Sequence, residues 1–168
     1  MHALTRKASD NLHIDMQKAL EFYVVFSRFE YALKEQLYVH KGKKPKNLEV
    51  NFDTFAKDIR TNFAKAILDE ATLKVAVSYF CQNPPRKQIW DGTKPDWSPA
   101  ETGVQPTSYE MLLLIRQVRN NLFHGGKGWL SPEGNAERDK ILMTHAITMI
   151  AAMIECHADV KQAFSSFQ

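Results

Sequence analysis

Residues 107–123, TSYEMLLLIRQVRNNLF, decide the fold class of this chain. Thr107 and Glu110 have the spacing of a capping box, in which the hydroxyl accepts a backbone N–H and the carboxylate reaches back to an earlier one. Apolar residues follow at helical spacing, and Gly125-Gly126 supplies a left-handed stop after the last of them. We therefore predict one well-defined helix between a threonine cap and a double glycine.

This predicted helix has an apolar and a polar side. At about 100° per residue, the apolar side collects five residues: Met111, Leu114, Ile115, Val118 and Leu122. Charged and polar residues gather on the other side, near the C-terminal end: Arg116, Arg119, Asn120 and His124. Leu112 and Leu113 fall on that polar side one or two turns earlier. Their position predicts that the polar side is covered, and we expect a second copy of the chain to cover it.

Helical periodicity extends over most of the remaining chain. Four further helices are expected: about 10–39, capped by Asp10 or Asn11; about 52–68; 71–81, where the alternative is a strand; and about 136–163, capped by Asn135. No convincing pair of strands is evident. The pattern predicts a single all-α domain over residues 1–168, a bundle of four to five helices.

Residues 83–106 interrupt this pattern. They contain five prolines and two tryptophans: Pro84, Pro85, Pro95, Pro99, Pro106, Trp90 and Trp97. Proline prevents a helix from continuing, and about 25 residues without regular structure is long for a compact domain. We therefore expect a long Pro-rich loop, either functional or a flexible insert.

Composition and charge indicate a folded soluble protein. Hydrophobic residues make up 44% and charged residues 24%, the usual globular balance. The net charge of +3 is compatible with an anionic partner. Cys81 and Cys156 are typical of a reducing compartment, although one bridge between them remains an alternative. No signal peptide or membrane span is expected, because the longest apolar run, 141–154, is short and contains His145. We expect a cytoplasmic location.

The polar group near the end of the predicted helix has the chemistry of metal-free phosphodiester cleavage. Arginine binds phosphate oxygens, histidine moves protons near neutral pH, and asparagine orients either. No metal-binding, Walker or dinucleotide motif is present, so no metal or cofactor is expected. Arg6…His13 and Arg138…His145 have a similar spacing, and we interpret His145 as a packed core histidine. Only the pair at 119–124 has a neighbouring asparagine and a following Gly-Gly.

The string RNNLFHGG at residues 119–126 resembles the Arg-polar-x3-His motif of HEPN domains (higher eukaryotes and prokaryotes nucleotide-binding). The stretch FSRFEYALK at residues 26–34 is similar to the first helix of many members of that family. The resemblance implies an α-helical bundle that dimerises so that two motifs face each other in a composite site. In active members it implies a metal-independent endoribonuclease in which the ribose 2′-OH attacks the adjacent phosphate.

Carried over by position, the resemblance makes Arg119, Asn120 and His124 catalytic. The interpretation adds Arg116, Glu30 and Lys127 as supporting or RNA-binding residues. Single-stranded RNA would be the substrate, and the protein would be an effector of a toxin–antitoxin or phage-defence system, with a cognate antitoxin as a further partner. One alternative is a non-catalytic HEPN module that binds RNA, a nucleotide or a protein. Another is a helical interaction domain whose Arg–His face is simply solvated.

Overall fold

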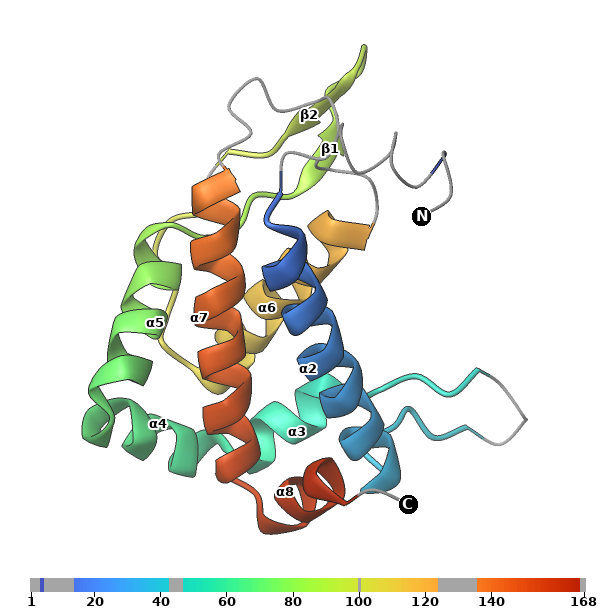
Figure 1. Ribbon diagram of the computed structural model, residues 1–168, viewed down its shortest axis with the longest axis vertical. Coiled ribbons are helices and arrows are strands. Elements are labelled where there is room, and N and C mark those ends of the chain that lie inside the picture. The colour runs from blue at the N-terminus through green and yellow to red at the C-terminus, as the bar shows by residue number, and fades with distance from the viewer. Residues whose placement is uncertain (1–3, 5–13, 43–46, 100, 124–135, 167–168) are drawn as a thin grey trace.

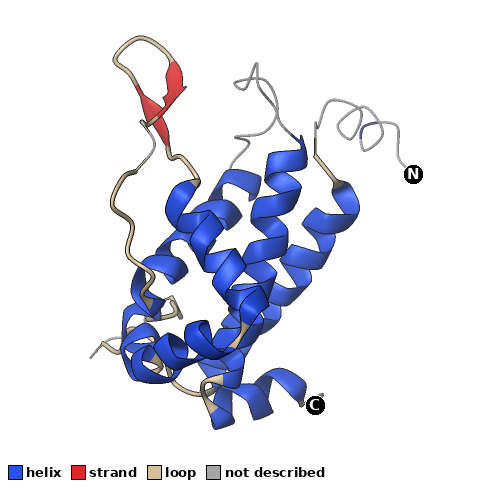
Figure 2. Ribbon diagram, turned by 90° about the vertical axis from the view of Figure 1, so that its left-hand side faces the viewer, coloured by secondary structure: helices blue, strands red, loops and turns tan. Residues whose placement is uncertain are grey.

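The structure, a computed structural model, describes residues 4, 14–42, 47–99, 101–123 and 136–166. Over these residues the chain is mostly helical, with one small two-stranded hairpin (Figures 1 and 2). The elements, in chain order, are α2 (Met16–Glu35), α3 (Phe52–Asp58), α4 (Arg60–Asp69), α5 (Ala71–Gln82), β1 (Gln88–Trp90), β2 (Pro95–Trp97), α6 (Ser108–Phe123), α7 (Ala136–Glu155) and α8 (Ala158–Ser165). The prediction of a mostly helical fold is confirmed.

The helix α7 lies at the centre of the bundle. It packs against α2 on one side and α5 on the other, and α6 lies behind it in Figure 1. The short helices α3, α4 and α8 lie across the lower end. The upper end is where α2 and α7 begin and α6 ends, and the hairpin extends beyond the helices there (Figure 2).

The core is built on the aromatic stripe of α2. Phe22, Phe26, Phe29 and Leu33 are buried, as their helical spacing predicts. The ring of Phe29 meets that of Phe55 on α3 edge-on, with centroids 5.5 Å apart. Burial of each such side chain contributes about 1.5–3 kcal/mol, so this stripe alone is a large share of the driving force for folding.

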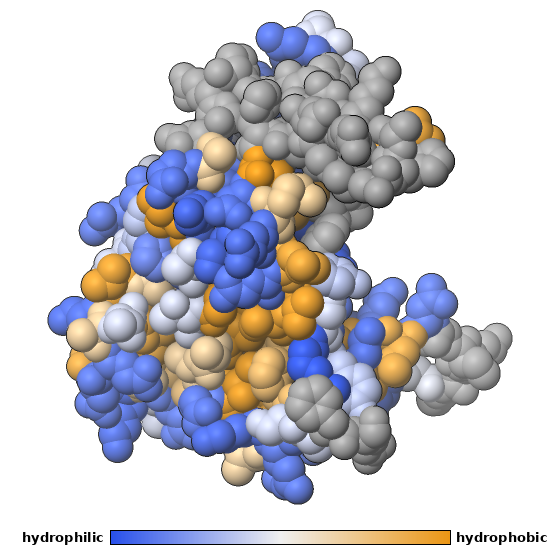
Figure 3. Space-filling model, viewed as in Figure 1, coloured by the Kyte–Doolittle hydropathy of each residue, from blue (hydrophilic) through white to orange (hydrophobic). Residues whose placement is uncertain are grey.

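The helix α2 also carries apolar side chains outside the core. Leu20, Tyr23, Val24 and Tyr31 are exposed, which agrees with a helix that is apolar on several sides. Figure 3 shows apolar surface among hydrophilic residues on the face where α2 and α7 lie. The bundle therefore uses only part of the apolar surface of this helix.

Two predicted helices are each divided into two. The segment expected as one helix over 52–68 breaks at the buried Ile59, and the last helix breaks after Glu155. Neither break has glycine or proline. His157 begins α8 in extended conformation and accepts the backbone N–H of Val160 at 3.4 Å. The described residues therefore form seven helices, so the prediction of four to five was wrong.

The first long helix is shorter than expected. It begins after Asp15, whose Oδ1 accepts the backbone N–H of Lys18 at 2.9 Å. It ends at Glu35 instead of Val39, because Leu37 adopts a positive φ of 60°. The expected caps Asp10, Asn11 and Asn135 lie outside the described residues.

The Pro-rich stretch contains regular structure, contrary to the prediction. Strands β1 and β2 pair antiparallel, with Trp90 opposite Pro95 and Gln88 opposite Trp97. The connecting turn is closed by Asp91, whose Oδ1 accepts the backbone N–H groups of Thr93 and Lys94 at 2.7 and 2.8 Å. The strands have three residues each, too few for a clear alternating pattern, and Pro95 stands at the first position of its strand, where proline is tolerated.

No single helix in the described part of the chain is long and apolar enough to cross a bilayer. The pair α7 and α8 reaches that length and apolar content together, but the chain bends by 117° between them.

Candidate functional site

The start of α6 is fixed by two hydroxyl groups. Thr107 Oγ1 accepts the backbone N–H of Glu110 at 3.1 Å, which confirms the threonine cap. Ser108, only 2% exposed, donates from Oγ to the carbonyl of Ala56 at 2.7 Å. This second bond joins α6 to α3, so the helix that carries the candidate site has a defined position in the bundle.

The two sides of α6 differ from the helical-wheel prediction at one residue. The five predicted core residues are buried or partly buried: Met111, Leu114, Ile115, Val118 and Leu122. Leu112, however, is only 2% exposed, so the chain itself already covers that part of the polar side. Leu113 is 36% exposed. The inference from Leu112 to a second copy was therefore wrong, and the dimer remains a prediction from the resemblance.

Arg119 and Asn120 lie together near the end of α6. Arg119 Nη1 donates to Asn120 Oδ1 at 3.0 Å, and both side chains are half-buried. The guanidinium carbon of Arg119 is 5.7 Å from the ring centroid of Phe26 on α2, within the range of a cation–π contact. These contacts restrict the guanidinium in a position that is only partly solvated.

Arg116 repeats this arrangement one turn earlier. Its guanidinium carbon is 4.7 Å from the ring centroid of Phe52. Glu30 is half-buried on α2, but no hydrogen bond or ion pair joins it to Arg116 or Arg119. The structure thus brings the two arginines onto neighbouring aromatic rings, and Glu30 has no hydrogen bond or ion pair with either of them. His124 and Lys127 lie outside the described residues.

Asn121 is a residue that the sequence analysis missed. Its side chain, 7% exposed, accepts from Gln117 Nε2 at 2.7 Å and donates from Nδ2 to the carbonyl of Arg86 at 2.9 Å. Arg138 at the start of α7 donates to the carbonyl of Pro84 at 3.2 Å. The base of the hairpin is therefore bound to α6 and α7 beside the candidate site. The only signal for it in the sequence is its position next to Asn120.

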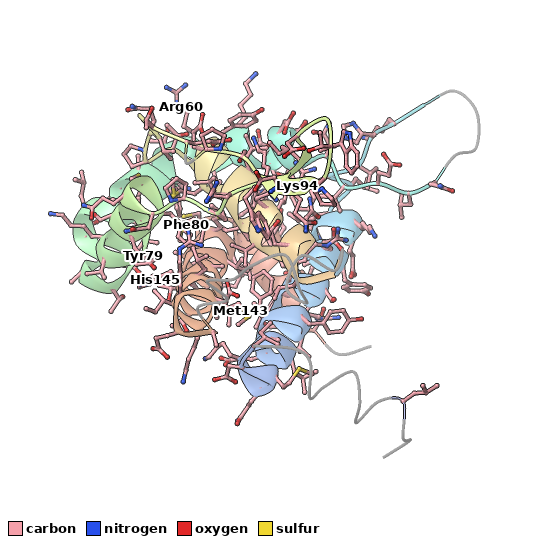
Figure 4. All side chains as sticks on the ribbon, turned by 90° about the horizontal axis from the view of Figure 1, so that it is seen from above. Arg60, Tyr79, Phe80, Lys94, Met143 and His145 are labelled. Carbon is pink, nitrogen blue, oxygen red and sulfur yellow. The ribbon has the colours of Figure 1, made fainter. Side chains whose placement is uncertain are left out.

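His145 is packed against another helix, in agreement with its interpretation as a structural residue. Its ring lies 4.9 Å from that of Tyr79 (Figure 4), and burial lowers the pKa of the imidazole. It is half-buried, so the contact belongs to the edge of the core. His13 lies outside the described residues.

The two cysteines are free and half-buried. Burial raises the pKa of both thiols, that of Cys156 to about 11, and acidic neighbours add to the effect. The thiolate is the nucleophilic form of cysteine, and reactive cysteines have a lowered thiol pKa. The raised pKa of Cys81 and of Cys156 is therefore typical of unreactive thiols. The described residues also contain no group of three or more His, Cys, Asp or Glu side chains placed to hold a metal ion.

Comparisons with known protein families, curated proteins and solved structures find no match to this chain.

Proposed function

We propose that this protein is a metal-independent endoribonuclease of the HEPN type that cleaves single-stranded RNA. The observation that supports it most is the hydrogen-bonded pair of Arg119 and Asn120 near the end of α6, which precede His124 by five and four residues in the sequence. Within this proposal the protein is the effector of a toxin–antitoxin or phage-defence system.

In the proposed reaction the ribose 2′-OH attacks the adjacent phosphorus, and the bond to the 5′-oxygen of the next nucleotide breaks. The products are a 2′,3′-cyclic phosphate and a free 5′-hydroxyl. His124 transfers the proton, a contribution that is typically about 10²–10⁴-fold. Arg119 stabilises the charge that develops on the phosphate oxygens, and its contacts with Asn120 and Phe26 orient it for that role.

The neighbouring residues have supporting roles in the proposal. Arg116, on the ring of Phe52, adds positive charge one turn from Arg119. Lys127 contacts the RNA backbone. Glu30 has no hydrogen bond or ion pair with either arginine, so we assign it only an indirect electrostatic effect on the site.

The ribonuclease proposal is tested with purified protein and single-stranded RNA in EDTA. We expect products with 2′,3′-cyclic phosphate ends, and a loss of at least about 100-fold in rate for His124→Ala and for Arg119→Ala. Arg60→Ala, an exposed arginine at the lower end of the bundle, is the matched control and should cleave like the wild type. Equal cleavage by the wild type and His124→Ala would contradict the proposal.

A homodimer with a composite active site forms part of the same proposal. Light scattering at tens of micromolar should report two chains, and a strict monomer would contradict the composite site. RNA binding without any cleavage would favour the non-catalytic HEPN module instead.

A further inference from the structure

The hairpin β1–β2 is held firmly to the helical bundle. Arg86 donates to the carbonyl of Trp97 at 2.9 Å and also to that of Ser98, so its side chain bridges the two sides of the hairpin base. Lys87 N donates to Ser98 Oγ at 3.0 Å. The carbonyl of Arg86 is the group that Asn121 binds. The hairpin is therefore held beside the C-terminal end of α6 and is stabilised by hydrogen bonds of its own.

The strand register places both tryptophans on one face of the hairpin. Directly paired residues point to the same side and alternate residues share a face, so Trp90 and Pro95 lie on the same side as Gln88 and Trp97. Trp97 is the diagonal neighbour of Trp90, within reach of a large aromatic side chain. Trp90 is 66% exposed, more than any other aromatic side chain in the described segments, while Trp97 is half-buried. We call these four residues the tryptophan face.

No carboxylate of the two strands lies on the tryptophan face. The hairpin and its base carry three cations, Arg86, Lys87 and Lys94, and three carboxylates, Asp91, Asp96 and Glu101, and Lys87 Nζ is paired with Glu101 Oε1 at 2.6 Å. The Asp91 carboxylate is turned into the tight turn, where it accepts backbone N–H groups. Asp96 pairs with Ile89 on the opposite side from the tryptophans.

The hydrogen bond between Asn121 and the Arg86 carbonyl brings the tryptophan face near the candidate site. Trp90 follows Arg86 by four residues, which span at most about 13 Å at about 3.3 Å per residue. Asn121, which holds the Arg86 carbonyl, follows Arg119 by two residues on α6. A single strand of RNA with its phosphate at Arg119 would need to extend only a few nucleotides to reach the hairpin.

We propose that the tryptophan face is a base-stacking platform for the single-stranded RNA that the candidate site cleaves. Every nucleobase has a flat π-face, so an exposed tryptophan binds single strands with little sequence preference. Arg86 at the base of the hairpin, whose guanidinium is held by the carbonyls of Trp97 and Ser98, supplies positive charge for the phosphates. This inference rests on the proposed function for its substrate, but it concerns binding and not the chemical step.

Binding is measured with a fluorescently labelled 2′-O-methyl oligonucleotide of ten residues, which lacks the attacking hydroxyl and stays intact. Trp90→Ala should weaken the affinity by about tenfold, and Trp90→Phe, which keeps an aromatic face, by less than about threefold. Tyr109→Ala is the matched control, since Tyr109 is an exposed aromatic residue, 45% exposed, at the other end of α6. The wild type should also show quenching of tryptophan fluorescence on binding, and Trp90→Phe should show less of it.

Equal affinity of the wild type and Trp90→Ala would overturn the stacking platform, as would a wild type that does not bind the oligonucleotide. A Trp90→Ala variant that binds RNA normally but loses a protein partner would also overturn it, in favour of a protein-docking hairpin. Cleavage is scored separately on unmodified RNA. Trp90-dependent binding without cleavage would contradict only the proposed nuclease activity. Cleavage without Trp90-dependent binding would contradict only the stacking platform.

Discussion

Replacing Asn121 by alanine should release the hairpin from the bundle. The change removes two hydrogen bonds, from Gln117 and to the Arg86 carbonyl. Each contributes about 0.5–1.5 kcal/mol net, and the partly buried carbonyl of Arg86, left without its partner, raises the cost. We therefore expect the free energy of unfolding to fall by about 2 kcal/mol. For a domain of this size that corresponds to a decrease of about 4–8 °C in Tm.

The matched control for this prediction is Asn62→Ala. Asn62 is also an asparagine within a helix, and it donates one hydrogen bond, to the carbonyl of Cys156 at 3.0 Å, from an exposed position. Both substitutions gain the same helix propensity, so the difference between the variants reports the tertiary contacts. Urea unfolding should place Asn62→Ala within about 0.5 kcal/mol of the wild type.

Hydrogen exchange locates the effect of Asn121→Ala. The backbone N–H of Ser98 bonds to the Lys87 carbonyl and that of Asp91 to the Lys94 carbonyl. Both amides should exchange faster in Asn121→Ala, with α2 unchanged. If the two asparagine variants lose the same stability, or if the hairpin amides keep their protection, the reasoning that Asn121 anchors the hairpin is refuted.

Two pH-dependent predictions concern the stability of the fold. Burial, with the hydrogen bond to Asp58, raises the pKa of Tyr38 to about 12, so the neutral phenol's contribution to folding stability is present below pH 10 and is lost between about pH 10 and 12. The Tyr38→Phe variant should therefore lose stability less steeply with pH in that range, as urea titrations would show. Parallel curves for the two proteins would count against this prediction. Burial lowers the pKa of His145, so its neutral form is the stabilising one, and stability should fall as the pH drops below about 6.5. His145→Phe keeps the ring against Tyr79 and should flatten that acidic fall in Tm; an unchanged slope would assign it to other groups.

The helices that sequence periodicity predicts best are those with an amphipathic pattern and a local cap. The helix α6 begins after Thr107 as expected, and the buried stripe of α2 agrees with the spacing of its phenylalanines. The favoured helix over 71–81 is confirmed by α5, Ala71–Gln82. These features depend on side chains within one or two turns, which is why they can be read locally.

The breaks at Ile59 and after Glu155 have no local signal. The chain bends there because Phe55, Ile59 and Phe63 are all buried in one core and because α8 turns across the lower end of the bundle. The hairpin was missed for the same kind of reason. Its short strands depend on the Arg86 side chain and on Asn121, which is 35 residues further along the chain.

At the candidate site, the sequence alone determined which chemical groups lie together on one side of α6, because that depends only on the 3.6-residue period. The tertiary structure decided their surroundings: Arg119 on the ring of Phe26, Arg116 on that of Phe52, Leu112 buried and Asn121 bound to the hairpin. Those partners come from α2, from α3 and from the hairpin base. Contacts between distant segments depend on how the helices pack, and periodicity within a single helix carries no information about its neighbours.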